Sequence, residues 1–326
     1  MPQLTVRVER WPIAGRFVLA RGAKTEAVVV VAEIAEDGHN GRGECVPYAR
    51  YGETPDGVAA AISALDQPIA EGMTRTALQR ALPPGAARNA LDCALLDFEA
   101  KKSGRPVQEI LGVSPPAPLH TALTLSLDEP EAMAKAASAA QDFPILKVKL
   151  GPDGAAERIA AVAAAAPAAQ IIVDANEAWD LAALTALLPA LLAARVVLIE
   201  QPLPAEADAA LEGFLSPIPL CADESIHSRA ELDDVARRYA CINIKLDKTG
   251  GLDEALALAQ AARARGLKIM VGSMVATSLS MAPAMLLAQR ADYVDLDGPL
   301  LLAKDRAPGI TYAGSLMAPP PPALWG

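Results

Sequence analysis

The chain of 326 residues is 52% hydrophobic but only 4% aromatic, so we expect an aliphatic core in one large domain or two ordinary ones. Its net charge of −10 argues against nucleic acid as a partner, and no stretch has the roughly 20 apolar residues of a membrane span or the apolar segment of a secretory signal. Its four cysteines show neither CxxC spacing nor a dense framework, which is typical of reduced thiols and predicts a cytoplasmic protein.

The first part of the chain predicts a small α+β domain over residues 1–115. The stretches LTVRVERWPI and EAVVVVAEIAED are typical of antiparallel strands, joined by a glycine-containing loop. Helical patterns follow, notably over residues 86–104, where Gly104 is expected to end the helix. The proline-rich residues 114–119 predict a linker to a second domain.

From residue 120 onward the pattern alternates between strand and helix. Eight strands are expected at residues 121–127, 145–150, 170–176, 195–201, 219–224, 242–247, 268–273 and 293–298. Helical stretches lie between them, for example at residues 130–141, 181–194, 229–240 and 252–266. This alternation predicts a parallel sheet covered by helices. We expect a modified TIM barrel, (β/α)7β, over residues 116–300, with the tail 301–326 returning to the first domain. An open doubly wound sheet is the alternative, although no GxGxxG follows its first strand.

Charged residues end four successive strands of the expected barrel. Asp174, Glu200, Asp223 and Lys245 are separated by 26, 23 and 22 residues, about one strand–helix unit each. Parallel barrel strands bring their C-terminal ends to one mouth, so these side chains are expected to meet there. A single charge at a strand end often marks only its exit into solvent. Three carboxylates in successive units instead predict hard oxygen ligands for one Mg²⁺ per subunit.

Two lysines of the second strand add acid/base chemistry. Lys147 and Lys149 are two residues apart, so both side chains are expected to point into the barrel or its mouth. Their mutual repulsion is expected to lower the pKa of the lysines and make one a base near neutral pH. Lys245 lies on the sixth strand, opposite the second, an arrangement that suits racemisation or epimerisation. An edge strand with two solvated lysines is the alternative.

The motifs KVK, DANEAW, IEQPLP, ADES and NIKLDKTGG resemble those of the enolase superfamily, in its muconate-lactonizing branch. The resemblance covers essentially the whole chain and implies that the N-terminal domain is a cap. It also implies Asp174, Glu200 and Asp223 as Mg²⁺ ligands, Lys149 and Lys245 as acid/base residues, and Lys147 as a charge-stabilising residue. The chain departs from the branch at Ala276, where many members carry an acidic residue, so no role is carried over to that position.

The last expected strand narrows the substrate. Asp295 and Asp297 again lie two apart and should share a face at the mouth. Here the chain is similar to dipeptide epimerases, and among them to those that act on L-Ala-D/L-Glu in murein peptide metabolism. This similarity implies that the acidic pair binds the free α-amino group, and that the C-terminal residue is epimerised by 1,1-proton transfer through an enediolate.

The other end of the substrate is expected to meet the cap. Lys24, in the loop that also carries Arg21, is the candidate partner for a glutamate side chain, and Tyr48, Arg50 and Tyr51 lie in a second loop. Thr124 and Ser273 are expected to contact the ligand or line the mouth.

Two alternatives stay open. An N-acylamino-acid racemase or o-succinylbenzoate synthase would use the same metal and lysines on a substrate without a free amine. A catalytically silent, metal-dependent binding protein would need neither opposed lysine. The sequence also leaves open whether the chain forms a homo-oligomer.

Overall fold

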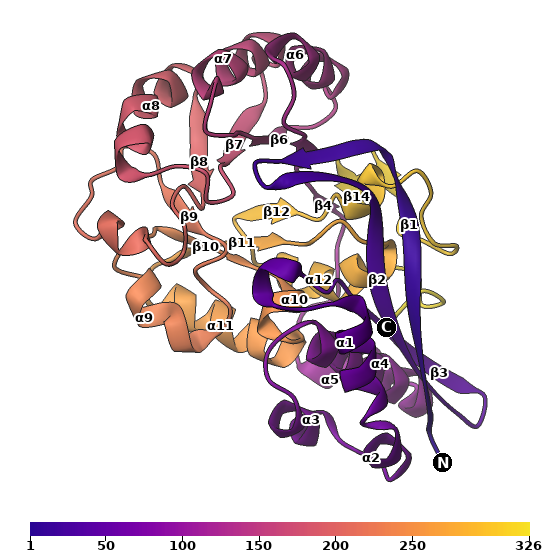
Figure 1. Cartoon of the computed structure of the whole chain (residues 1–326). Coiled ribbons are helices and arrows are strands. Elements are labelled where there is room, and N and C mark those ends of the chain that lie inside the picture. The colour runs from indigo at the N-terminus through magenta and orange to yellow at the C-terminus, as the bar shows by residue number, and fades with distance from the viewer.

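The computed structural model describes residues 1–326, and its N-terminal part is an antiparallel sheet packed on helices (Figure 1). The sheet has the order β1 (Gln3–Leu19), β2 (Gly22–Glu36), β3 (His39–Cys45). The helices are α1 (Pro55–Ser63), α2 (Asp66–Ala70), α3 (Arg75–Ala81), α4 (Ala86–Ser103) and α5 (Val107–Leu111). The two predicted strands and the long helix are confirmed, and Gly104 ends α4 in a left-handed conformation with φ 66°.

Helix α4 lies directly against β3 because two glycines of that strand have no side chain. A Cβ atom on Gly41 would stand 2.2 Å from the backbone nitrogen of Phe98, and one on Gly43 would stand 2.0 Å from the carbonyl oxygen of Ala90. Any larger residue at these positions would push the helix off the sheet. The core between sheet and helices is aliphatic and includes Val30, Ile34, Ile62, Leu78 and Leu91.

The eight predicted parallel strands are all present and lie side by side in chain order, which confirms the barrel. They are β5 (Leu123–Leu125), β6 (Ile145–Lys149), β7 (Gln170–Asp174), β8 (Val196–Glu200), β9 (Leu220–Ala222), β10 (Cys241–Ile244), β11 (Lys268–Gly272) and β12 (Tyr293–Asp295). The amide of Ala122 donates a hydrogen bond of 2.8 Å to the carbonyl of Val294, which brings the two ends of the sheet together.

Side chains inside the barrel change from apolar to charged along several strands. Ile172, Leu198, Cys221, Cys241 and Met270 form one buried apolar cluster. Ile172 and Leu198 precede Asp174 and Glu200 by two residues and therefore share their face. The lower half of the barrel is thus filled by apolar side chains, and the charged residues of the site lie further toward the C-terminal ends of the strands.

Helices cover the outside of the barrel, as the alternating pattern predicted (Figure 1). They are α6 (Pro130–Ala139), α7 (Ala155–Ala165), α8 (Leu181–Ala193), α11 (Leu252–Ala264) and α12 (Ser278–Ala288). The helix predicted over 229–240 is wrong in length: only a 3-10 turn, Arg229–Glu231, and α9 (Leu232–Val235) form. The following chain instead turns so that the hydroxyl of Tyr239 reaches Asp208, at 2.9 Å. After β12 the only helical element is a 3-10 turn, Gly298–Leu301, so the eighth helix is missing as expected.

The C-terminal residues return to the first part of the chain. β13 (Tyr312–Ala313) and β14 (Leu316–Met317) form a small sheet with β4 (Leu119–His120). The indole of Trp325 then donates a hydrogen bond of 3.1 Å to the carbonyl of Cys93 in α4. The domain limits at residues 115 and 300 stay predictions. None of the helices is long and apolar enough to cross a membrane.

Candidate active site

A cavity of about 650 Å³ lies between the N-terminal part and the C-terminal ends of the barrel strands. Most of the residues singled out in the sequence line it: Lys24, Thr124, Lys147, Lys149, Asp223, Lys245, Ser273, Asp295 and Asp297. Asp174 and Glu200, which are completely buried, carry the carboxylates that contact the lysines of this cavity. The structure therefore brings the sequence-predicted residues into one site.

Lys147 stands among three carboxylates. Its Nζ lies 2.7 Å from Glu200, 2.8 Å from Asp295 and 3.1 Å from Asp174. Carboxylates from three other strands thus share one buried ammonium group, and Lys147 is linked directly to the acidic pair of the last strand.

Each of the other two lysines is paired with a carboxylate. Lys149 Nζ lies 2.5 Å from Asp174, and Lys245 Nζ lies 2.7 Å from Asp223. Lys149 is on β6 and Lys245 directly follows β10, and these strands are the second and sixth of the eight. They therefore face the cavity from opposite sides of the barrel, as predicted.

Two further residues that orient these carboxylates were not singled out in the sequence. Lys248, in the single turn α10 (Leu246–Thr249), is completely buried and donates hydrogen bonds of 2.6 Å to the side chain and the carbonyl of Asp223. The amide of Asn243 donates one of 2.8 Å to Glu200. Asn243 stands two residues before Lys245 on the same strand face, and this spacing was the signal available for it.

The charges of the site perturb one another strongly. Burial opposes the charge on Lys147 and Lys245, but the surrounding carboxylates outweigh it, so the pKa of each is raised. The prediction that mutual repulsion with Lys149 lowers the pKa of Lys147 is therefore wrong, because Asp295, Glu200 and Asp174 surround the Lys147 ammonium group. Burial together with the charge of Asp174 raises the pKa of Glu200 to about 7.

The donors of the site fit a hard divalent cation. In this structure the three strand-end carboxylates are bound by lysines, and no group of three acidic, histidine or cysteine side chains has the spacing of a metal site. Glu200 Oε2 is buried and makes no directional hydrogen bond, although the Lys147 ammonium is 2.7 Å away. A buried carboxylate oxygen without a donor is costly, and a cation coordinated by oxygen would satisfy it.

The acidic pair of the last strand faces the cavity beside the first strand. Asp297 accepts a hydrogen bond of 2.6 Å from the backbone amide of Thr124, and the Thr124 hydroxyl is 3.5 Å from Asp295. Burial and the charge of Asp295 raise the pKa of Asp297 to about 7. The hydroxyl of Ser273 donates to the carbonyl of Asp295, at 3.4 Å. Thr124 and Ser273 thus line the mouth and hold the acidic pair in place.

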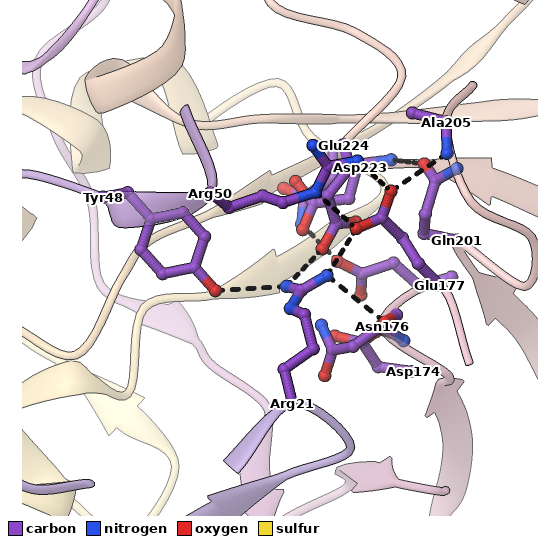
Figure 2. Close-up of polar contacts among 12 residues, drawn as sticks. Arg21, Tyr48, Arg50, Asp174, Asn176, Glu177, Gln201, Ala205, Asp223 and Glu224 are labelled. Carbon is purple, nitrogen blue, oxygen red and sulfur yellow. Dashed lines mark hydrogen bonds and ion pairs between the residues drawn. The ribbon is translucent and has the colours of Figure 1, made fainter. Parts of the chain in front are cut away.

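Arg21 joins the cap to the barrel (Figure 2). It occupies the turn between β1 and β2, and its guanidinium lies 2.6 Å from Glu177 and 2.6 Å from Glu224. Glu177 also binds Arg50, at 2.9 Å. Both glutamates lie in the same motifs as Asp174 and Asp223, but local spacing could not show that their partners come from the cap.

Lys24 lies in β2, where it is paired with Phe17 of β1, so its predicted position in a loop is wrong. The connecting turn is shorter than expected because β1 continues to Leu19 and β2 begins at Gly22. Lys24 has no carboxylate partner, and its Nζ lies 4.9 Å from the centre of the Tyr48 ring. Burial, and then the charges of Arg21 and Lys245, lower the pKa of Lys24.

Comparisons with known proteins agree with this geometry. L-Ala-D/L-Glu epimerase of Escherichia coli K12 is 46% identical over 94% of this chain and 97% of its own. N-acetyl-D-glutamate racemase of a Pseudoalteromonas species is 50% identical over 91% of this chain and 95% of its own. A crystal structure of an enolase family member from Agrobacterium tumefaciens, with homology to dipeptide epimerases and with bound sodium and L-Ala-L-Glu, is 49% identical, covers both chains fully and has a TM-score of 0.98.

Two family models together match most of the chain. Residues 1–112 match the mandelate racemase/muconate lactonizing enzyme N-terminal domain, and residues 131–317 match the enolase C-terminal domain-like family. The resemblance seen in the strand-end motifs is confirmed: the chain belongs to the enolase superfamily, in its mandelate racemase/muconate lactonizing branch.

Proposed function

We propose that this chain is a Mg²⁺-dependent dipeptide epimerase that inverts the C-terminal residue of L-Ala-L-Glu and L-Ala-D-Glu. The observation that carries the proposal is the opposition of Lys149 and Lys245 across one cavity. A Cα between them would be reached by one ammonium or amine on each face, and inversion requires a proton to leave from one face and return to the other.

The charges of the cavity predict how the dipeptide binds. The substrate α-carboxylate would lie near Lys147 and the three strand-end carboxylates, Asp174, Glu200 and Asp223, which would hold Mg²⁺. The free ammonium group would bind Asp295 and Asp297 at the last strand. The side-chain carboxylate of glutamate would reach Lys24, because Arg21 and Arg50 are already paired with glutamates.

The protein's own residues would carry the proton transfer. The proton α to a carboxylate is a very weak acid, because its removal places a second negative charge on that carboxylate. A bound Mg²⁺ would supply electrostatic stabilisation of this charge. Lys147 would hold its proton, since its pKa is raised, and would stabilise the same charge through its ammonium group. One of Lys149 and Lys245 would take the α-proton, and the other would return a proton on the opposite face.

N-acylglutamate racemisation is the second candidate, favoured by the 50% identity to N-acetyl-D-glutamate racemase. N-acetyl-glutamate and Ala-Glu share the acylated glutamate and differ in the ammonium-bearing carbon of alanine. Lys24 would serve both substrates equally, whereas only the dipeptide offers an ammonium group to Asp295 and Asp297. The acidic pair therefore favours the dipeptide.

We place the activity in the cytoplasm, in the metabolism of murein peptides. All four cysteines are unpaired and buried, as expected for a reducing compartment.

The test is a substrate panel with the Mg²⁺-supplemented protein, followed by chiral analysis of the hydrolysed product. L-Ala-L-Glu should yield D-glutamate, and L-Ala-D-Glu should yield L-glutamate, both with the alanine unchanged. N-acetyl-L-glutamate should react more slowly. Inversion of N-acetyl-L-glutamate in clear preference to L-Ala-L-Glu would replace the proposal by the racemase.

A further inference from the structure

Lys24 is the cation of the cap that enters the cavity without an anionic partner. The two arginines beside it, Arg21 and Arg50, are each bound by two carboxylates. A lysine side chain has four flexible bonds and in isolation would turn toward water. Some other contact must therefore keep Lys24 in the cavity.

That contact is the ring of Tyr48. The Lys24 ammonium lies 4.9 Å from the ring centre, within the range of a cation–π interaction. The contact leaves the ammonium free of any anion, so a substrate carboxylate can bind it without breaking an ion pair. Arg21, by contrast, would have to give up Glu177 or Glu224.

The Tyr48 ring is itself held from several sides. Its hydroxyl accepts a hydrogen bond of 3.1 Å from Arg21 (Figure 2), and its backbone amide donates one of 3.0 Å to Glu53. Its ring packs edge-on against Tyr51, with centres 5.2 Å apart, and Tyr51 packs in the same way against His227, at 4.4 Å. His227 follows β9 in the barrel, so both parts of the molecule fix the ring.

We propose that Tyr48 is a positioning residue that sets the preference for an acidic side chain by holding Lys24 in the cavity. The inference rests on the proposed function and adds to it a residue that touches the specificity-determining lysine. A neutral substrate side chain in the same place would leave the Lys24 charge without a partner. The preference for an acidic over a neutral side chain therefore depends on the Lys24 ammonium group being kept in the cavity. The ring face carries this role, and the hydroxyl contact with Arg21 is secondary.

The test compares L-Ala-L-Glu with its neutral isostere L-Ala-L-Gln, in the full chain with Mg²⁺. Tyr48→Leu should lower the ratio of kcat/KM for the two dipeptides by about tenfold, through a higher KM for the glutamate substrate, as expected for loss of a desolvated cation–π contact. Tyr48→Phe keeps the ring and should hold the ratio within about threefold of the wild type. Lys24→Met should abolish the preference, and adding Tyr48→Leu to it should change the ratio no further.

Tyr293→Leu is the matched control. Tyr293 also lies beside a lysine, Lys268, with 5.8 Å between ammonium and ring centre, but it does not line the cavity. Its removal should leave the ratio unchanged. An unchanged ratio in Tyr48→Leu would overturn the proposal, as would equal losses in Tyr48→Phe and Tyr48→Leu, which would assign the effect to the Arg21 contact.

Equilibrium binding separates this inference from the proposed function. Dissociation constants of the two dipeptides, measured by calorimetry on the same variants, report Lys24 positioning without turnover. Turnover of neither dipeptide by the wild type would refute the epimerase. Tyr48 would still be shown to position Lys24 if the ratio of dissociation constants fell in Tyr48→Leu and not in Tyr48→Phe, and it would be refuted if that ratio stayed constant.

Discussion

Lys245 donates a hydrogen bond of 2.7 Å to Asp223, so a proposed acid/base residue is paired directly with a proposed metal ligand. Lys149 and Asp174 repeat the relationship at 2.5 Å on the other side of the barrel. Lys248 donates a hydrogen bond of 2.6 Å to the second oxygen of Asp223, so that carboxylate is held by two lysines. The protonation of Lys149 and Lys245 is therefore linked to the charge of the carboxylates proposed to bind the metal, Asp174 and Asp223.

The first prediction concerns the metal. Treatment with EDTA should abolish epimerisation and Mg²⁺ should restore it. The substrate α-carboxylate would otherwise bind beside buried carboxylates of the same charge, and the cation offsets this repulsion. Mg²⁺ should also raise the melting temperature, with a stabilisation of about 2.7 kcal/mol at a hundredfold excess over Kd. Asp223→Asn should lose most of that stabilisation. Full activity of thoroughly metal-stripped protein is the result that would rule out the assignment.

The second prediction concerns the ammonium group of the dipeptide. N-acetylation of L-Ala-L-Glu should lower kcat/KM at least about a hundredfold, because leaving a buried carboxylate without its partner costs about 3–5 kcal/mol. Asp297→Asn keeps an oxygen for the Thr124 amide but removes the charge. It should therefore reduce the difference in kcat/KM between L-Ala-L-Glu and its N-acetylated form. Asp297→Gly should weaken dipeptide use further. A wild type that prefers the acetylated compound would contradict the assignment of the acidic pair.

The third prediction follows from the lowered pKa of Lys24. A lysine is charged below its pKa, so its charge is lost as pH rises, and at a lower pH than for an ordinary lysine. The preference for L-Ala-L-Glu over L-Ala-L-Gln should therefore fall as pH rises, at a lower pH than an ordinary lysine would give. Lys24→Arg, which stays charged, should keep the preference to higher pH. Parallel pH profiles for the two dipeptides would show that Lys24 does not bind the side chain.

The fourth prediction concerns the joint between cap and barrel. Asp247 is buried, accepts hydrogen bonds from Val46 and Asn89, and has its pKa raised by burial to about 7. A raised pKa favours the protonated folded state, so this stabilisation is complete below about pH 4 and is lost as pH rises through about 7. Asp247→Asn should therefore gain stability relative to the wild type between pH 5 and pH 8, by about 1–3 kcal/mol.

Urea denaturation at the two pH values measures this difference, with the exposed Asp56→Asn as the control. The control should show no such gain. If the midpoints of Asp247→Asn and wild type differ by the same amount at both values, the carboxylate is not neutral in the folded protein.

Much of the fold and the site follows from periodic sequence features. The barrel was predictable because each strand is a short apolar run followed by a helical stretch, and the ligands and lysines because they end those runs. β3 was not predictable from HNGRGEC, which lacks apolar alternation and forms a strand because Gly41 and Gly43 admit helix α4.

Contacts between distant segments were beyond such patterns. Arg21 meets Glu177 and Glu224, which lie more than 150 residues further along the chain, and nothing local specifies that contact. The turn at Arg21 also explains why the prediction placed Lys24 in a loop. Gly22 indicated a loop that reaches Lys24, but β1 and β2 pair up to Leu19 and Gly22, so only a two-residue turn joins them. The direction in which the pKa of Lys147 and Lys245 shifts could not be predicted from the sequence, because it depends on the positions of the carboxylates in the folded barrel.

The most direct test of the two-base account is deuterium exchange at the substrate Cα. Both epimers of L-Ala-Glu are incubated in D₂O with Mg²⁺ and followed by proton NMR, using the wild type, Lys149→Ala and Lys245→Ala. The wild type should exchange and interconvert both epimers. Each variant should lose interconversion, and each should retain exchange of one epimer only, a different one in the two variants, because the remaining lysine faces only one of the two α-protons. Near-normal interconversion by either variant, or exchange of the same epimer by both, would contradict the account.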